Sequence, residues 1–172
     1  MMIIHATKKA LKIAGITALA NIPDDYPAMP GSWTATVISL GIPGKMATLL
    51  VHDVTRITLL LEGKSLNATL PRLKDQLILF LQRTHHMELL PLFLVQTPIQ
   101  IYAPPSRSMT AHVNTISGYM PYQFKRHQTA QTLDFQRIED IYYGYIFTTK
   151  QYGKKFITTS EILDRLRMHV VN

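Results

Sequence analysis

The chain has 172 residues, of which 47% are apolar and 17% charged, a composition that predicts a folded domain and excludes a disordered chain. It has 18 Lys and Arg against 11 Asp and Glu, so its formal net charge of +7 favours contact with polyanions without establishing it. It contains no cysteine, which excludes a disulfide framework, cysteine-ligated zinc, iron–sulfur clusters and thiol catalysis.

The first predicted elements are a short apolar strand over residues 2–5 and a helix over residues 8–13. Thr7 is suited to cap this helix and Gly15 to end it. At the N-terminus, the basic residues come after the short apolar run, which is the reverse of their order in a signal peptide. The apolar runs are also far shorter than a membrane span, so we expect a cytoplasmic protein that does not enter a membrane.

Residues 21–31 carry three prolines and two aspartates and are predicted to be a loop. The next segment alternates, with Trp33, Ala35 and Val37 on one face, which predicts a strand over residues 32–41. Two leucine-rich strands follow over residues 45–53 and 55–63, joined by a tight corner. Such short connections predict an antiparallel meander, and the leucine-rich runs indicate at least one strand covered on both faces.

Several helices follow the meander. Apolar residues recur every three or four positions from residue 66 to 81, and Pro71 fits best in a first turn, so we expect a helix over residues 71–83. A short helix over residues 87–94 and a strand over residues 98–102 come next. Prolines 104 and 105 should end that strand. Ser106 or Ser108 should then cap a helix whose apolar face comprises Met109, Val113, Ile116 and Met120.

A polar break over residues 128–132 precedes an aromatic, amphipathic segment over residues 133–146. A turn at residues 153–155 and a short extended piece lead to TTSE at residues 158–161, a capping box that opens a helix over residues 161–168. The whole pattern predicts a single α+β domain over residues 1–172, an antiparallel meander of three or more strands with several helices on one face. An alternative division of the chain assigns residues 128–172 to a C-terminal helical subdomain.

Three segments carry a resemblance: MIIHATKKALK, GSWTATVISL with KMATLLVHDVTRITLLLEG, and SRSMTAHVNTI. Together they resemble an uncharacterised bacterial family of domains of unknown function, which has an opening strand with Thr-Lys-Lys, a Trp-x-Ala strand and an Arg-Ser-x-x-Gly-Ser-x-Asn segment. The resemblance covers roughly residues 2–125, and the chain departs from the pattern at Ala111 and His112, where Gly and Ser are usual. No activity is established for the family, so the resemblance implies a fold-level grouping and no mechanism. The residues on its pattern are Thr7, Lys8, Lys9, Trp33, Arg107, Ser108 and Asn114.

The segment with Arg107, Ser108 and Asn114 has two interpretations. In the structural one, Ser108 caps a helix and Asn114 holds a neighbouring loop. Arg107 then bonds to carbonyls or pairs with an internal carboxylate, for instance that of Asp53 or Glu62. In the functional one, Arg107, Ser108 and free backbone N–H groups bind a phosphate or carboxylate at a surface cleft. Lys8 and Lys9 oppose the helix dipole, so they are either a solvated pair or face an acidic partner.

The seven histidines show no spacing typical of a metal site, and we expect neither a metal nor a cofactor. Ser108 and His112 lie four apart on one helix, but the nucleophile elbow of serine hydrolases is absent. The aromatic run over residues 138–155, with Tyr142 and Tyr145, suits either base stacking or a protein interface.

These patterns predict a non-enzymatic binding protein with a macromolecular partner. We expect the partner to be a protein, with nucleic acid as the second choice. A bacterial toxin–antitoxin, phage-defence or mobile-element system would be its setting. The alternative is a metal-independent nuclease, or another enzyme acting on nucleic acid, that uses His112, Arg107 and Lys8. The sequence leaves the oligomeric state open. The binding residues expected are Lys8, Lys9, Arg107, Ser108, Asn114, Tyr142 and Tyr145.

Overall fold

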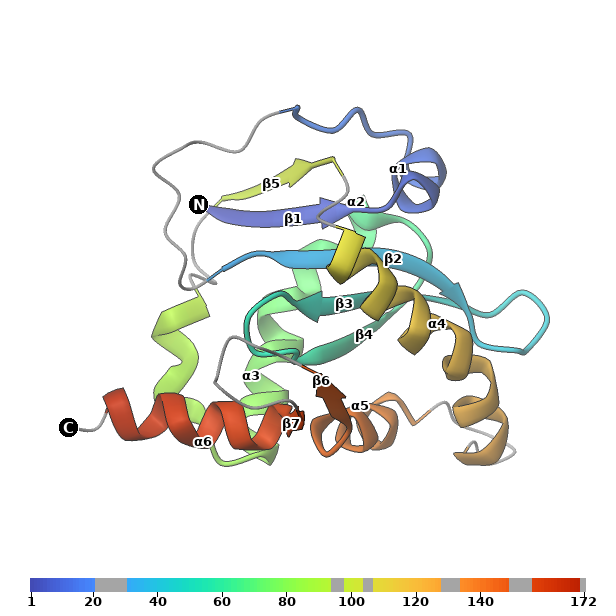
Figure 1. Ribbon diagram of the computed structural model, residues 1–172. Coiled ribbons are helices and arrows are strands. Elements are labelled where there is room, and N and C mark those ends of the chain that lie inside the picture. Colours follow the sequence, from blue (N-terminus) through green and yellow to red (C-terminus); the bar gives the residue numbers. More distant parts are fainter. Residues whose placement is uncertain (21–30, 94–97, 104–106, 128–133, 149–155, 171–172) are drawn as a thin grey trace.

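The computed structural model describes residues 1–20, 31–93, 98–103, 107–127, 134–148 and 156–170. Within these residues, a five-stranded sheet has the order β4-β3-β2-β1-β5, and a smaller sheet pairs β6 with β7 (Figure 1). The strands are β1 (Met2–Ala6), β2 (Trp33–Ser39), β3 (Met46–His52), β4 (Thr58–Glu62), β5 (Ile99–Tyr102), β6 (Ile146–Thr148) and β7 (Phe156–Thr158). The helices are α1 (Lys8–Ala14), α2 (Leu66–Thr69), α3 (Leu73–Arg83), α4 (Arg107–His127), α5 (Phe135–Tyr143) and α6 (Thr159–Val170), with 3-10 turns η1 (Leu70–Arg72) and η2 (Met87–Phe93).

The large sheet is mixed. Strands β2, β3 and β4 form the predicted antiparallel meander, because their connections are short enough for each strand to turn back on its neighbour. Strand β1 runs parallel to both β2 and β5, and helix α1 supplies the crossover from β1 to β2. The α+β fold is therefore confirmed, while its sheet extends beyond an antiparallel meander.

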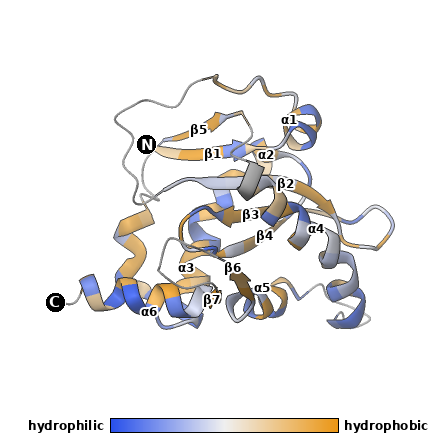
Figure 2. Cartoon of the chain, viewed as in Figure 1, coloured by the Kyte–Doolittle hydropathy of each residue, from blue (hydrophilic) through white to orange (hydrophobic). Residues whose placement is uncertain are grey.

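Helices cover both faces of this sheet, so the prediction of helices on one face is wrong. On one face, Trp33, Ala35 and Val37 pack with Leu77 and Phe80 of α3. The other face packs against α4 and α5 through a second apolar cluster. Figure 2 shows the corresponding concentration of apolar residues along the strands. The second cluster includes Ile38, Leu49, Leu60, Val113, Ile116 and Ile138.

The predicted caps of α1 and α6 are confirmed, although α6 extends two residues beyond the prediction at each end. The Thr7 hydroxyl accepts a hydrogen bond from the Ala10 amide at 3.3 Å, and Gly15 ends α1 in the left-handed conformation at φ 65°. At α6, the Glu161 amide donates to the Thr158 hydroxyl and the Thr158 amide donates to the Glu161 carboxylate. This reciprocal pair is the capping box that TTSE predicts.

The region around Pro71 differs from the prediction. Helical structure begins five residues earlier at Leu66, passes through the 3-10 turn η1 that contains Pro71, and continues as α3. Pro71 lies within the first two positions of that turn, where proline is tolerated because its fixed φ suits the start of a helical segment. The segments predicted as loop, break or turn at residues 21–30, 104–105, 128–132 and 153–155 lie outside the described residues.

Helix α4 is longer than its apolar pattern indicated, because it continues past Pro121 to His127. The turn between β2 and β3 lies against α4 at Pro121, since a Cβ atom placed on Gly41 would lie 3.2 Å from the Pro121 Cβ atom. Within the described part of the chain, no helix is long and apolar enough to cross a membrane.

Gly41 and Gly44 give a matched test of this contact, because both have positive φ angles, 75° and 73°. A Cβ atom on Gly44 would meet no atom within 4 Å. We expect Gly44→Ala to cost about 1–2 kcal/mol for the left-handed backbone. Gly41→Ala should cost about 1–3 kcal/mol more because of overpacking against Pro121. Chemical denaturation measures both values, and equal losses would contradict the contact.

Candidate functional site

Two of the three segments of the resemblance contain the starts of helices, α1 and α4, which follow neighbouring strands. Strands β1 and β5 are parallel, with His5 paired to Tyr102, so the helices that follow them both begin at one edge of the sheet. Lys8 and Lys9 are exposed at the start of α1. Helix α4 begins at Arg107, and Ser108 is its second residue. The prediction that Ser108 caps this helix is therefore wrong. The side chains of Arg107 and Ser108, like all of Ser106, lie outside the described residues.

Both carboxylates considered as internal partners of Arg107 have other contacts. Asp53 accepts hydrogen bonds from the hydroxyls of Thr34, at 2.8 Å, and Ser32. Glu62 lies 3.8 Å from the Lys45 ammonium group in an exposed ion pair. Asp53 thereby attaches the corner after β3 to strand β2, and burial raises the pKa of its carboxyl.

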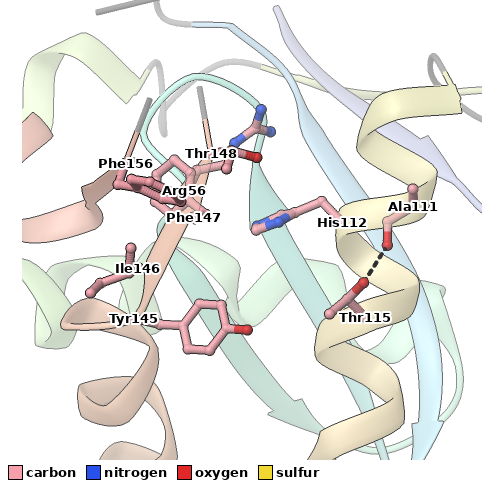
Figure 3. Close-up of a pocket in the computed structure, with 9 residues that line it drawn as sticks. All are labelled: Arg56, Ala111, His112, Thr115, Tyr145, Ile146, Phe147, Thr148 and Phe156. Atoms are coloured by element: carbon pink, nitrogen blue, oxygen red, sulfur yellow. Dashed lines mark hydrogen bonds between the residues drawn. The ribbon is translucent and has the colours of Figure 1, made fainter. Parts of the chain in front are cut away.

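A polar pocket of about 420 Å³ lies between α4, the β3–β4 turn and the small sheet (Figure 3). His112 extends from α4 toward the space between Arg56 and Tyr145. The Arg56 guanidinium lies 5.8 Å from the centre of the Phe147 ring and against the sulfur of Met109. The pocket is lined by Arg56, Ala111, His112, Thr115, Tyr145, Ile146, Phe147, Thr148 and Phe156.

Arg56 is a pocket residue that the sequence prediction missed. It lies in the β3–β4 turn with φ 62°, and its carbonyl accepts hydrogen bonds from the hydroxyls of Thr58 and Thr159 at 3.2 Å each. Thr159 is more than a hundred residues away, at the start of α6. The contact between the turn and α6 has no counterpart in local sequence patterns, which explains the omission.

His112 is a neutral side chain at physiological pH. Burial, together with the positive charge of Arg56, lowers the pKa of its imidazole to about 4. Its ring meets Phe147 edge to face, with 5.6 Å between the ring centres. His112 can therefore donate or accept a hydrogen bond in this pocket, but it does not add positive charge.

A second, more apolar pocket of about 590 Å³ adjoins the first, because Tyr145 lines both. Tyr119 and Tyr122 of α4 line this second pocket, and 58% and 60% of their surface is exposed. The sequence prediction included Tyr142 and Tyr145 and missed these two. Their signal was the spacing of residues 112, 115, 119 and 122, which places them on one face of a helix. The second pocket is lined by Tyr119, Tyr122, Gln123, Ile141, Tyr142 and Tyr145.

Tyr142 is a buried residue in the wall of the second pocket. Only 4% of its surface is exposed, and its hydroxyl has no hydrogen-bond partner among the described residues. Burial, followed by the neighbouring Tyr145 and Tyr119, raises the pKa of this hydroxyl to about 12. The hydroxyl therefore keeps its proton and is available as a hydrogen-bond donor.

A buried carboxylate connects the helices to the sheet behind these pockets. Glu139 of α5 accepts hydrogen bonds from the Leu60 amide at 2.9 Å, the Gln76 side chain at 2.9 Å and the Arg83 guanidinium at 3.0 Å. Burial outweighs these donors and raises the pKa of Glu139 to about 7. Glu139 thus joins α5, α3 and the outer strand β4.

The remaining predicted residues lie apart from both pockets. Asn114 is exposed on α4 and lines neither of them, and the same holds for Lys8 and Lys9 on α1. Within the described part of the chain, no three His, Asp or Glu side chains are close enough together to hold a metal ion. The structure thus places Tyr142, Tyr145 and His112 around two adjoining pockets and leaves Lys8, Lys9 and Asn114 outside them.

The described residues form an α+β fold, a mixed sheet with helices on both faces, and two adjoining pockets rich in aromatic side chains. The chain belongs to a family described as Domain of unknown function (DUF6933), whose model matches residues 3–156. This match covers the strands of the resemblance and also the two pockets. No curated protein and no solved structure matches the chain.

The pKa of Glu139 leads to a pH-dependent stability. The folded protein holds this proton more tightly than the unfolded chain, whose pKa has the ordinary value of 4.5. The resulting stabilisation is full below about pH 4.5 and is lost as the pH rises through about 7, a change of roughly 3 kcal/mol. The lowered pKa of His112 acts in the opposite direction over an overlapping range, so the test is a difference between two proteins. We expect the free energy of unfolding of the native chain, measured relative to that of Glu139→Gln, to fall between about pH 4.5 and 7. Denaturant titrations across the range measure the difference, and parallel curves would contradict the raised pKa.

Proposed function

We propose that this protein binds a macromolecular partner through the surface around the two adjoining pockets. The observation that carries the proposal is a group of exposed apolar side chains, named here the aromatic surface. It comes from α4, the end of α5 and the small sheet. It consists of Tyr119, Tyr122, Tyr145, Ile146 and Phe156.

A gathered surface of this kind favours binding over a purely structural role. Single exposed apolar residues are normal on a protein, whereas contiguous ones mark interaction sites. Tyrosine is enriched at interfaces, because its ring supplies apolar area while its hydroxyl remains hydrogen-bonded to water or to the partner. Ile146 and Phe156 are 61% and 57% exposed, so a partner that covers them gains apolar burial.

The test is affinity capture from the native host, with bound proteins and nucleic acids both identified. We expect the native chain to retain a partner that the double variant Tyr119→Ser/Tyr122→Ser loses. Leu79→Ser is the matched control, because Leu79 is an exposed apolar residue of α3 that lies outside the aromatic surface. Equal retention by all three proteins would contradict the proposal. The identity of the partner also tests the toxin–antitoxin, phage-defence or mobile-element setting.

A second candidate function is a nuclease, favoured by the position of His112 beside Arg56 in the polar pocket. Arg56 would then serve as the phosphate clamp, since Lys8 does not line this pocket. A base with a pKa of about 4 binds protons weakly at neutral pH, which makes His112 a poor general base there. Binding without catalysis is therefore the better-supported function.

An RNA cleavage assay separates the two functions. Labelled RNA incubated with the purified protein and a chelator should remain intact, because the pocket offers a weak base. His112→Ala should leave that result unchanged. Cleavage by the native protein that disappears in His112→Ala would establish the nuclease and overturn binding without catalysis.

A further inference from the structure

We propose that the partner of the aromatic surface is a single strand of nucleic acid, lying along α4 with its bases on the tyrosines. This inference rests on the proposed function and names the class of partner. Single strands expose the flat faces of their bases, which stack on aromatic side chains irrespective of sequence. A duplex conceals those faces, so the proposal is specific to unpaired nucleotides.

The geometry of α4 provides a continuous track. His112, Thr115, Tyr119, Tyr122 and Arg126 follow one another at intervals of three and four residues, which places them on one side of the helix. From His112 to Arg126 this side is about 21 Å long at the rise of an α-helix. The track begins in the polar pocket, passes the second pocket and ends in the basic last turn of α4.

Tyrosine rings are arranged along the middle of the track for stacking. Tyr119 and Tyr122 are more than half exposed, so their ring faces are accessible to a base. Tyr145 lies at the junction of the pockets, with its ring centre 5.6 Å from that of Tyr142 and the two planes tilted by 51°. A base seated between the α4 tyrosines and Tyr145 would occupy part of the second pocket and leave room for its sugar and a neighbouring nucleotide.

The Tyr142 hydroxyl supplies a separate reason for a polar ligand in that pocket. It is buried, protonated and without a hydrogen-bond partner among the described residues. Leaving such a donor unsatisfied costs about 1–3 kcal/mol, so a ligand gains affinity if its binding turns the buried hydroxyl toward the pocket and accepts the hydrogen bond. Carbonyl oxygens and ring nitrogens of bases are acceptors of this kind.

The charges around the track suit a phosphate backbone. The residues that line the two pockets include no Asp or Glu, and Arg56 is their charged member. Lys125 and Arg126 are exposed at the far end of α4. A third pocket, beside α3, differs in charge, because it is lined by Glu62 and Asp75 as well as by Arg72. The chain as a whole carries +7, which attracts a polyanion over a longer range.

The experiment is fluorescence anisotropy with short labelled RNA and DNA single strands of mixed sequence, the matching duplex and a poly-glutamate peptide. We expect the single strands to bind more tightly than the duplex and the peptide, with affinity falling as salt rises. Tyr119→Ala and Tyr122→Ala should each weaken strand binding about tenfold. The Phe variants at the same positions keep the ring and should bind like the native chain. Leu79→Ala is the matched surface control and should bind normally.

Tyr142→Phe tests the buried donor. Loss of this single hydrogen bond should weaken strand binding about fivefold while the folded state is kept or stabilised, because the variant removes an unsatisfied polar group. Thermal denaturation of every variant separates lost binding from lost folding. Unchanged binding by Tyr142→Phe together with the tyrosine-to-alanine variants would overturn the inference.

The outcomes also separate this inference from the proposed function. Tyrosine-dependent binding of the acidic peptide, with no strand bound, would overturn the nucleic-acid inference and leave a binding protein for an acidic protein partner. Preference for the duplex would overturn it as well. Failure of the proposed function would appear elsewhere, as capture of the same host partner by the native chain and by Tyr119→Ser/Tyr122→Ser.

Discussion

The organisation of this domain depends on the burial of strands β3 and β4 on both faces. Leu49 and Leu60 belong to one core cluster, whereas Leu50, Leu59 and Leu61 belong to the other. Leucines that alternate between two apolar environments require a helical layer on each side, since water on either side would leave one set exposed. Helices α4 and α5 are therefore held against the sheet by the same strands that hold α3.

Strand β4 is an outer strand of the sheet, so its outward N–H groups need partners from elsewhere in the chain. Glu139 provides one by accepting the Leu60 amide hydrogen, and Arg83 and Gln76 then share the carboxylate. Burial of this carboxyl raises its pKa to about 7, so the attachment of α5 to the sheet is sensitive to pH. Helix α5 in turn carries Tyr142 and precedes Tyr145, which ties the position of the candidate site to this contact.

The candidate site lies on the outer side of the α4–α5 layer. Because Met109, Val113, Ile116 and Met120 face the sheet, the neighbouring side of α4 presents Tyr119 and Tyr122 to solvent and His112 to the polar pocket. Different elements supply the charged and the aromatic side chains of this site. Arg56 comes from a sheet turn, while His112 adds no charge, because burial and Arg56 keep it neutral. A surface that combines one cationic end, accessible rings and a buried hydroxyl donor is suited to binding more than to proton transfer.

Local patterns in the sequence determined much of the fold. The antiparallel meander, the Thr7 cap, the capping box at Thr158 and Glu161, and the apolar face of α4 were all predictable, because each depends on residues within one or two turns or one hairpin. Tyr142 and Tyr145 were identified in the same way, from an aromatic run that is contiguous in sequence.

Tertiary structure decided the features that join distant segments. The parallel pairing of β1 with β5 unites residues almost a hundred positions apart, and such pairing has no local signature. The second helical layer was missed because periodicity shows that a helix has an apolar face, but not which side of the sheet that face meets. The pockets arise from the same long-range packing, since Arg56, His112 and Tyr145 come from a turn, a helix and the segment after another helix. Only the burial of apolar area on both sides of the sheet brings these three side chains together.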